Sequence, residues 1–563
     1  MLTTLTAPAF AKEWDIEKGD ITVKAGEAEG PNKVKQGDND FVKDEGDTII
    51  TGKSNKNTVT IEAENENDKV EVTLRDLNID ASSGNKAAVS VTGKGDTNIE
   101  LNGDNELKGG YNRAGLEHNQ TVDSEGNVTS GKLTIQDDND NAGSLNATGG
   151  GFGAGIGGGS AKAGQVTITG GTITATSGDG AGIGGGQGNA VSNAGNADIE
   201  ISGGTIEATG GYTSAGIGGG CYGDATIKIT GDAVIKNATG GDYGAGIGGG
   251  GGGNGDVTIS GNAKIENAQG GLTGSGIGGG NGASGTVTIK DDSTVTATGG
   301  EAGTGIGGGY AGLGDVTIEG NTTVNATGGV GSAGIGGGVD SVNDNAGNGN
   351  KITIKSTESG SPTVKAVGGG TNKENQVFIG GAGIGSGAGD ATAEITLEGK
   401  VTITATAGKD NVAIGANGIE QKFSGLAEGS SITRYDSEGN NITLPTDPVP
   451  ADTSSSGGGS ADASVHESVF PGLVVTDKDG QHISYTSIRG NNVLSIRVGR
   501  FTASLRVSLA TLRQLRAEGI DTITFQTILC STTLSVDELL TMGGEDAEAV
   551  LTHRLTTSSL TVG

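Results

Sequence analysis

The chain is poor in the residue types from which most globular cores and active sites are built. Aromatic residues make up 3% of its 563 residues, and there are only four His, seven Pro, two Cys and one Trp. The two cysteines, Cys221 and Cys530, lie in segments of different character, so we expect no disulfide between them. No apolar run reaches the roughly 18 residues that a transmembrane helix requires, so we expect no membrane span.

Positively charged side chains are also scarce. The chain has 36 Lys and Arg against 67 Asp and Glu, which gives a net charge of −31. Arginine is absent between Ala114 and Thr433, and all but two of the net negative charges lie upstream of residue 465. Because so acidic a surface repels phosphate backbones and anionic lipids, the composition excludes nucleic acid and membrane surfaces as partners.

Glycine, by contrast, is abundant, with 113 residues concentrated in a recurring six-residue phrase. The phrase reads Ala-Gly-Ile-Gly-Gly-Gly at residues 245–250. Successive isoleucines at Ile247, Ile277, Ile306 and Ile335 are separated by 30, 29 and 29 residues. A fixed period of this length is typical of a solenoid. Further copies surround Ile156, Ile183 and Ile217, and degenerate copies surround Ile384 and Ile414.

Between the phrases, apolar and polar residues alternate as they do in short strands. Residues 256–259 read Asp-Val-Thr-Ile, and residues 294–298 read Thr-Val-Thr-Ala-Thr. With the strand around each isoleucine, this gives three short strands and Gly-rich turns per coil of about 30 residues, the pattern of a parallel β-helix. We expect three inward columns, which are Val257, Val287 and Val316; Ile259, Ile289 and Ile318; and the isoleucines of the phrase.

The domain organisation follows from changes in composition. We expect a clipped signal peptide at 1–11, ending in Ala9-Phe10-Ala11, then an N-terminal cap with irregular coils at 12–145. Regular coils occupy 146–444 and a Pro/Ser/Gly linker occupies 445–464. Residues 465–563 read as a small α+β module, with strands expected at 472–476, 482–486, 493–498, 502–507 and 522–529, and helices after Ser508 and Ser535.

Several words of the sequence resemble a known group of proteins. They are Trp14-Asp-Ile-Glu-Lys-Gly-Asp-Ile21, Val72-Thr-Leu-Arg-Asp-Leu-Asn-Ile-Asp-Ala-Ser-Ser83, and Leu101-Asn-Gly-Asp-Asn-Glu-Leu107. Together with the Gly-rich coils they resemble, over roughly residues 14–420, secreted clostridial-type (Firmicute) surface proteins labelled carbohydrate-binding-domain proteins. The resemblance implies a pectate-lyase-like right-handed β-helix on the surface of a Gram-positive bacterium, in contact with polysaccharide or host glycan. It supplies no catalytic residue that can be transferred to this chain.

The few aromatic residues gather beside the Gly-rich phrase. Phe152, Tyr212 and Tyr243 precede it by two or three residues, and Tyr222 and Tyr310 follow it. In stacked coils we expect these side chains to form exposed strips on which sugar rings could stack. The alternative interpretation is that the tyrosines shield glycine backbone in the turns.

Two other outward columns have possible functions. Asp198, Asp256 and Asp315 each precede a strand, which suggests turn-forming residues or a weak Ca²⁺ site, although Thr286 interrupts the column. Threonines recur at 172, 174 and 176, at 294, 296 and 298, and at 402, 404 and 406, the pattern of an ice-binding face, but charged residues such as Glu207, Lys236 and Glu266 interrupt it.

Catalysis is not indicated by the residues of the regular coils. A glycoside hydrolase needs two positioned carboxylates, and a uronate lyase needs a basic residue beside Ca²⁺-binding acids. The regular coils contain no Arg until Arg434 and no His, because the four histidines are His118, His466, His482 and His553. We therefore expect a monomeric, non-catalytic, extracellular glycan-binding or adhesin-like protein without an obligatory cofactor. The alternatives are a structural spacer that displays the C-terminal module and, with less support, a polysaccharide-degrading enzyme or an ice-binding protein.

Overall fold

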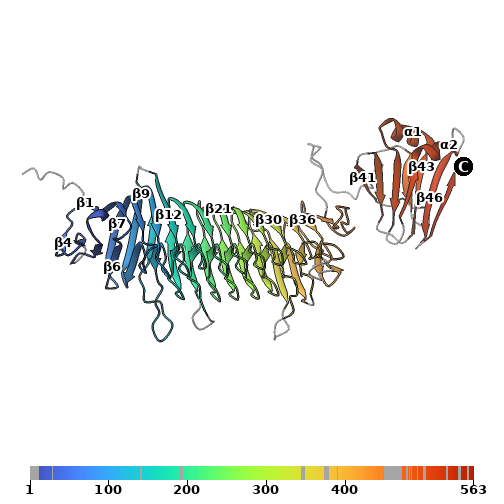
Figure 1. The fold of residues 1–563 in the computed structure, drawn as a ribbon. Helices are drawn as coiled ribbons and strands as arrows, with labels where there is room; N and C mark the ends of the chain where they lie inside the picture. Colours follow the sequence, from blue (N-terminus) through green and yellow to red (C-terminus); the bar gives the residue numbers. More distant parts are fainter. Residues whose placement is uncertain are drawn as a thin grey trace, which may run out of the picture. The chain divides into compact units, whose positions relative to one another are not determined.

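The computed structural model divides into two compact units, residues 1–451 and 452–563 (Figure 1). In the first unit it describes residues 12–448, apart from 28–29, 140–141, 190–194, 344–348, 373–378 and 390. In the second it describes residues 472–562, apart from 477–479, 481, 483–484, 491, 499–501, 528–530, 543–546 and 555–556. The expected signal peptide and Cys530 therefore lie outside the described residues.

The first unit is a right-handed parallel β-helix, as predicted, whose coils follow one another along its length (Figure 1). One coil consists of β23 (Gly255–Ile259), β24 (Lys264–Gln269) and β25 (Ile277–Gly278). Each strand pairs in parallel with its counterpart in the next coil, β26 (Gly285–Ile289), β27 (Thr294–Thr298) and β28 (Ile306–Gly307). The coil therefore has two longer strands and a third strand of only two residues.

The same three strands recur along the unit as three columns. The first column contains β11 (Leu133–Gln136), β14 (Gly164–Ile168), β17 (Ala197–Ile201), β20 (Ala225–Ile229), β29 (Gly314–Glu319), β32 (Asn350–Lys355) and β35 (Ala393–Glu398). The second contains β12 (Gly143–Thr148), β15 (Thr172–Thr176), β18 (Thr205–Thr209), β21 (Val234–Thr239), β30 (Thr323–Thr327), β33 (Thr363–Val367), β36 (Thr402–Thr406) and β39 (Ser431–Tyr435). The short column contains β10 (Leu116–His118), β13 (Ile156–Gly157), β16 (Ile183–Gly184), β19 (Ile217–Gly218), β22 (Ile247–Gly248), β31 (Ile335–Gly336), β34 (Ile384–Gly385) and β37 (Ile414–Ala416).

Register places identical apolar residues above one another in the core. Val257 pairs with Val287 and Ile259 with Ile289, and the isoleucine of each short strand pairs with that of the next. These side chains are fully or almost fully buried. Because burying one such side chain contributes about 1.5–3 kcal/mol, the stacked columns supply most of the driving force for the fold. The predicted inward columns are confirmed.

Glycine is required where the chain reverses around each short strand. The backbone N–H of Ala245 donates to the carbonyl of Gly249 at 3.0 Å, so the chain folds back directly after Ile247. Gly248 has φ +141°, and a Cβ there would overlap with the carbonyl oxygen of Gly278 in the next coil. A leading turn (240–244 in this coil) and a trailing turn (250–254) therefore flank the short strand. Successive coils bring these turns together, since the N–H of Gly251 donates to Thr213 O at 2.7 Å.

The N-terminal end is closed by irregular elements, as expected for a cap. The strand β2 (Ile21–Lys24) continues the short column and pairs antiparallel with β3 (Lys33–Gln36), which pairs with β4 (Val42–Lys43). The buried Trp14 donates from Nε1 to Asp44 Oδ2 at 2.7 Å. The other elements are β1 (Glu13–Asp15), η1 (Ile16–Lys18), β5 (Ile49–Ser54), β6 (Val59–Ala63), β7 (Lys69–Asp80), β8 (Val89–Gly93) and β9 (Asp96–Lys108).

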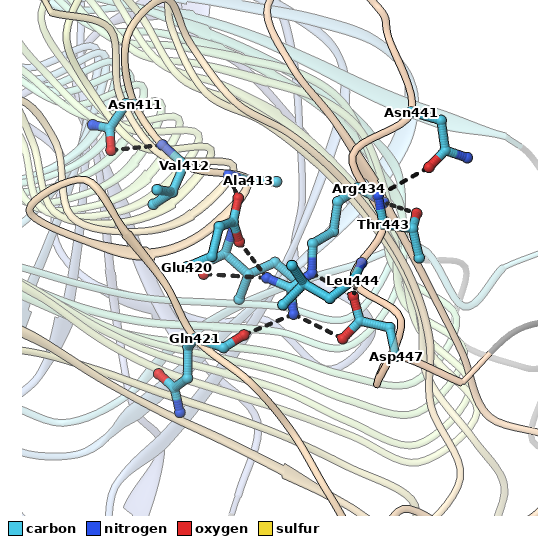
Figure 2. A network of polar contacts seen from close by, with 11 residues as sticks. Asn411, Val412, Ala413, Glu420, Gln421, Arg434, Asn441, Thr443, Leu444 and Asp447 are labelled. Carbon is cyan, nitrogen blue, oxygen red and sulfur yellow. Dashed lines mark hydrogen bonds and ion pairs between the residues drawn. The ribbon is translucent and has the colours of Figure 1, made fainter. Parts of the chain in front are cut away.

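The C-terminal end is closed by a buried arginine, shown in Figure 2. Arg434 pairs in register with Ala405, so its side chain occupies an inward position of the last coil. Its guanidinium contacts Asp447 through Nε at 2.7 Å and Nη2 at 3.0 Å, and Nη1 contacts Glu420, on β38 (Ile419–Glu420). Nη2 also donates to the carbonyl of Gln421 at 2.8 Å.

This closure corrects the predicted start of the linker. Asp447 is buried, and the carbonyl of Pro448 accepts from the N–H of Ile432 at 2.8 Å. Residues 445–448 therefore belong to the β-helix cap, because Asp447 neutralises the buried arginine. The remainder of the predicted linker lies outside the described residues.

The second unit has two sheets and two helices around its own core, in agreement with the α+β prediction. One sheet contains β40 (Leu473–Thr476), β43 (Thr502–Ser508), β46 (Glu548–Arg554) and β47 (Thr557–Val562). The other contains β41 (Thr486–Gly490), β42 (Val493–Arg497), β44 (Thr522–Gln526) and β45 (Ser531–Ser535). The helices α1 (Leu509–Ala517) and α2 (Val536–Thr541) begin after Ser508 and Ser535, whose hydroxyls accept from backbone N–H groups.

One predicted strand of this unit is misplaced. The sequence predicts a strand at 482–486, of which residues 483–484 lie outside the described residues. His482 forms an isolated bridge to Thr476, and β41 begins at Thr486. The physical reason is the hairpin with β42, in which Gly490 pairs with Val493 and so fixes the strand on the C-terminal side of Thr486.

Candidate functional site

The structure brings two of the predicted aromatic residues into contact on the turns beside the short strands. Tyr212 and Tyr243 lie in the leading turns of adjacent coils, with ring centroids 5.2 Å apart and planes at 87°. Their hydroxyls lie 3.4 Å apart, and this hydrogen bond raises the pKa of Tyr212. Tyr212 is 53% exposed, so about half of this residue is presented to solvent.

Tyr222 joins this pair across two glycines. A Cβ on Gly251 would lie 2.8 Å from Cβ of Tyr243, and a Cβ on Gly252 would lie 2.9 Å from Cδ1 of Tyr222. The dipeptide Gly251–Gly252 therefore separates Tyr243 from Tyr222, and the backbone between the two rings carries no side chains. We call Tyr212, Tyr222 and Tyr243 the tyrosine cluster. The shielding interpretation of the tyrosines holds in part, because the Tyr222 ring covers Gly252 while the residue remains 42% exposed.

Phe152 belongs to a second pair, which the sequence analysis missed. Its ring lies 6.0 Å from that of Tyr111, which is 58% exposed. Tyr111 stands three residues before Ala114, the spacing that Tyr212 has from Ala215, and this spacing was the available signal. The coil of β16, whose leading turn carries Asp179, separates the two aromatic pairs, so the aromatic residues do not form one continuous strip.

Tyr310 lies apart from the tyrosine cluster. It occupies the trailing turn of the coil of β28, and its hydroxyl donates to Asp340 Oδ2 at 2.9 Å. The hydrogen bond to this carboxylate raises the pKa of Tyr310. Tyr310 occupies the turn position that Cys221 occupies in the coil of β19, one residue before the position of Tyr222. The hydrogen bonds between coils show this, because the N–H of Gly282 donates to Tyr310 O just as the N–H of Tyr222 donates to Gly251 O. Tyr222 and Tyr310 therefore both follow the phrase, as predicted, but at turn positions one residue apart.

The aspartate column does not form a ladder of carboxylates. Asp198 pairs with Thr226, Thr226 with Asp256, and Asp256 with Thr286, which pairs with Asp315. Consecutive aspartates are thus two strand spacings apart, about 9–10 Å. One Ca²⁺ ion needs oxygens at about 2.3–2.6 Å and cannot bridge that distance. Among the described residues, no group of three or more His, Cys, Asp or Glu could hold a metal ion.

The threonine columns are partly continuous. Thr294, Thr323, Thr363 and Thr402 follow one another in register on the second column of strands. The neighbouring column on the same strands reads Thr296, Asn325, Lys365 and Thr404, so a charged side chain interrupts the face.

Two adjacent residues of types suited to acid–base chemistry, Glu117 and His118, lie buried in the irregular coils. Glu117 is 1% exposed and is held by Arg113 Nη2 at 2.8 Å and Asn119 Nδ2 at 2.9 Å. His118 is 2% exposed, and burial lowers its pKa. A surface hollow of about 470 Å³ at the N-terminal coils contains Glu17, Lys53 and Asp80, without a hydrogen-bonded acid–base pair among its described residues.

The comparisons with known proteins agree with the fold. The family described as Beta helix repeat matches residues 166–187, 199–221, 287–310 and 316–339. These segments cover the first and second strand columns and continue into the short strands and trailing turns. No curated protein and no solved structure matches the chain. No helix in the described part of the chain is long and apolar enough to cross a membrane.

Proposed function

We propose that the protein is a non-catalytic, secreted or surface-displayed β-helix that binds carbohydrate through the tyrosine cluster. The observation that carries the proposal is the exposure of Tyr212 and Tyr222, at 53% and 42%, on turns otherwise made of glycine and small polar residues. In a chain with 3% aromatic residues, two exposed rings on the coil of β19, with the half-buried Tyr243 on the next coil, form the kind of apolar surface that marks a binding site.

Aromatic rings suit carbohydrate because both partners are amphipathic. The face of a tyrosine ring is apolar and packs against the C–H face of a sugar, while its hydroxyl and nearby backbone groups remain free to bond sugar hydroxyls. The tyrosine cluster offers three rings around the low dipeptide Gly251–Gly252, which lets a ligand approach the backbone closely. Leu272, 48% exposed in the leading turn of the next coil, extends the apolar surface.

A structural spacer remains the second candidate function. It is supported by the contact of Tyr222 with Gly252 and of Tyr111 with Gly151, in which the ring covers backbone of the next coil. Both functions agree with the acidic, repetitive fold, so binding must distinguish them. The ice-binding alternative has less support, because Lys365 interrupts the threonine face.

The test is a glycan array with the full-length chain and the double variant Tyr212→Ala/Tyr243→Ala. Since truncation of two central aromatic contacts removes more than about 2 kcal/mol, we expect at least a tenfold loss of affinity. Tyr310→Ala is the matched control, because this exposed tyrosine lies outside the tyrosine cluster and should retain binding. Retained binding in the double variant would contradict the site, and absence of binding to any glycan would favour the spacer.

A further inference from the structure

The charges around the tyrosine cluster are all negative. The leading turns carry Asp179, Asp242 and Glu301 in the coils of β16, β22 and β28. The sequence of the leading and trailing turns between Ser177 and Gly349 contains no Lys or Arg. Of the lysines in these coils, Lys228, Lys236 and Lys264 lie on the two longer strand columns, and Lys290 directly follows β26.

These acids alternate with apolar side chains along the stacking direction. The N–H of Tyr243 donates to Tyr212 O, and the N–H of Thr273 donates to Asp242 O, which places Asp242 one coil beyond Tyr212 at the same turn position. The N–H of Ala302 donates to Leu272 O. From coil to coil, the side chains of the leading turns are therefore Asp179, Tyr212, Asp242, Leu272 and Glu301. Carboxylates therefore recur at about 9–10 Å, twice the strand spacing. Asp242 lies close enough to Tyr212 to contribute to the raised pKa of its phenol.

Resting on the proposed function, we infer that this surface selects a glycan polymer whose sugars carry protonated amino groups. Aromatic faces attract cations, and a carboxylate in the same turn adds a complementary charge. Uronic acid polymers meet only negative charges there and are repelled. A repeating row of acids also favours a polymer over a monosaccharide, since several weak contacts act together.

The second aromatic pair provides an internal contrast. The leading turn that carries Tyr111 also carries Arg113, and the trailing turn of the coil of Phe152 carries Lys162. This pair has no such excess of acids, so it should contribute little to selection for amino sugars.

The experiment compares binding of the full-length chain to three soluble oligosaccharides of equal length. They are a glucosamine oligomer, its fully N-acetylated form, and a galacturonic acid oligomer. We expect affinity to fall in the order glucosamine oligomer, N-acetylated oligomer, galacturonic acid oligomer. The preference for the glucosamine oligomer over its N-acetylated form should weaken in 0.5 M salt, because charges on exposed groups are screened. Asp242→Asn should weaken binding of the glucosamine oligomer about three- to fivefold and leave the N-acetylated form unchanged, as expected for one exposed charge pair. Phe152→Ala is the control and should leave the preference intact.

The outcomes separate this inference from the proposed function. Equal affinity for the glucosamine and N-acetylated oligomers, unchanged by Asp242→Asn, would overturn the inference while the tyrosine cluster remained a glycan site. Preference for galacturonic acid would also overturn it. Equally tight binding of a lysine oligomer of the same charge would overturn the assignment to a glycan. Absence of binding to all three oligosaccharides, together with an empty glycan array, would overturn the proposed function itself.

Discussion

Removal of the Arg434 side chain should open the C-terminal end of the β-helix. The side chains of Arg434 and Asp447 are both fully buried, with 0% of each exposed to solvent. The substitution Arg434→Ala removes both hydrogen bonds from the guanidinium to the Asp447 carboxylate, which keeps only the one from Leu444 N–H. It also removes the guanidinium donor from the carbonyl of Gln421. Breaking a buried pair by removing one partner costs about 3–5 kcal/mol, and we expect a loss of this size.

The loss should be local, because each coil of a solenoid contacts mainly its neighbours. Hydrogen exchange should show faster opening of β37 and β39 in Arg434→Ala, while the coils around β14 keep their protection. Arg434→Lys keeps the positive charge but lacks the planar guanidinium group, so the stability of this variant should lie between that of Arg434→Ala and that of the natural chain. The double variant Arg434→Met/Asp447→Leu removes both charges and should recover most of the loss.

A loss below about 1 kcal/mol in Arg434→Ala would refute this account, because it would mean that Asp447 is not stranded in a dry site. A double variant as unstable as the single one would refute it as well. In that case packing of the arginine side chain, rather than charge neutralisation, would close the core.

Two further predictions concern the interior of the coils. Gly248→Ala should destabilise the fold by several kcal/mol, because the new Cβ overlaps with the carbonyl of Gly278. Gly282 has φ +71°, but no atom lies within 4 Å of a Cβ placed there, so Gly282→Ala should cost only about 1–2 kcal/mol. Chemical denaturation of the two variants checks this, and equal losses would contradict it. Burial lowers the pKa of His118, so the neutral ring is favoured in the fold, and stability should fall as the pH drops below the unfolded value of about 6.5. His118→Gln should flatten the pH dependence of unfolding between pH 7 and 5, and an unchanged slope would exclude this histidine as its source.

The repeat makes the β-helix predictable from the sequence. Each coil repeats the same alternation, so the spacing of Val257, Val287 and Val316 assigns them to one inward column, and their register confirms it. Spacing alone also places the aromatic residues on the turns. It does not show that Tyr212 touches Tyr243 while Tyr310 bonds to Asp340, because each partner stands one turn position beyond the residue that aligns in the next coil, Asp242 or Val339.

Features that depend on contacts between distant residues were not predictable. The role of Arg434 requires Asp447 and Glu420 to converge on one inward position, and no local pattern signals this convergence. In the second unit, β45 and β46 were missed because polar and charged residues dominate both segments, and pairing with β44 and β43 decides their structure. Turn chemistry, by contrast, identified the helices after Ser508 and Ser535.

The central claim is that exposed tyrosines on stacked turns bind carbohydrate. Its most direct test is the affinity of the full-length chain for its best array glycan, compared with Tyr212→Ala/Tyr243→Ala and Tyr310→Ala. We predict at least a tenfold loss in the double variant, unchanged binding in Tyr310→Ala, and the same unfolding midpoint for all three proteins. Equal affinity of the double variant and the natural chain would contradict the claim.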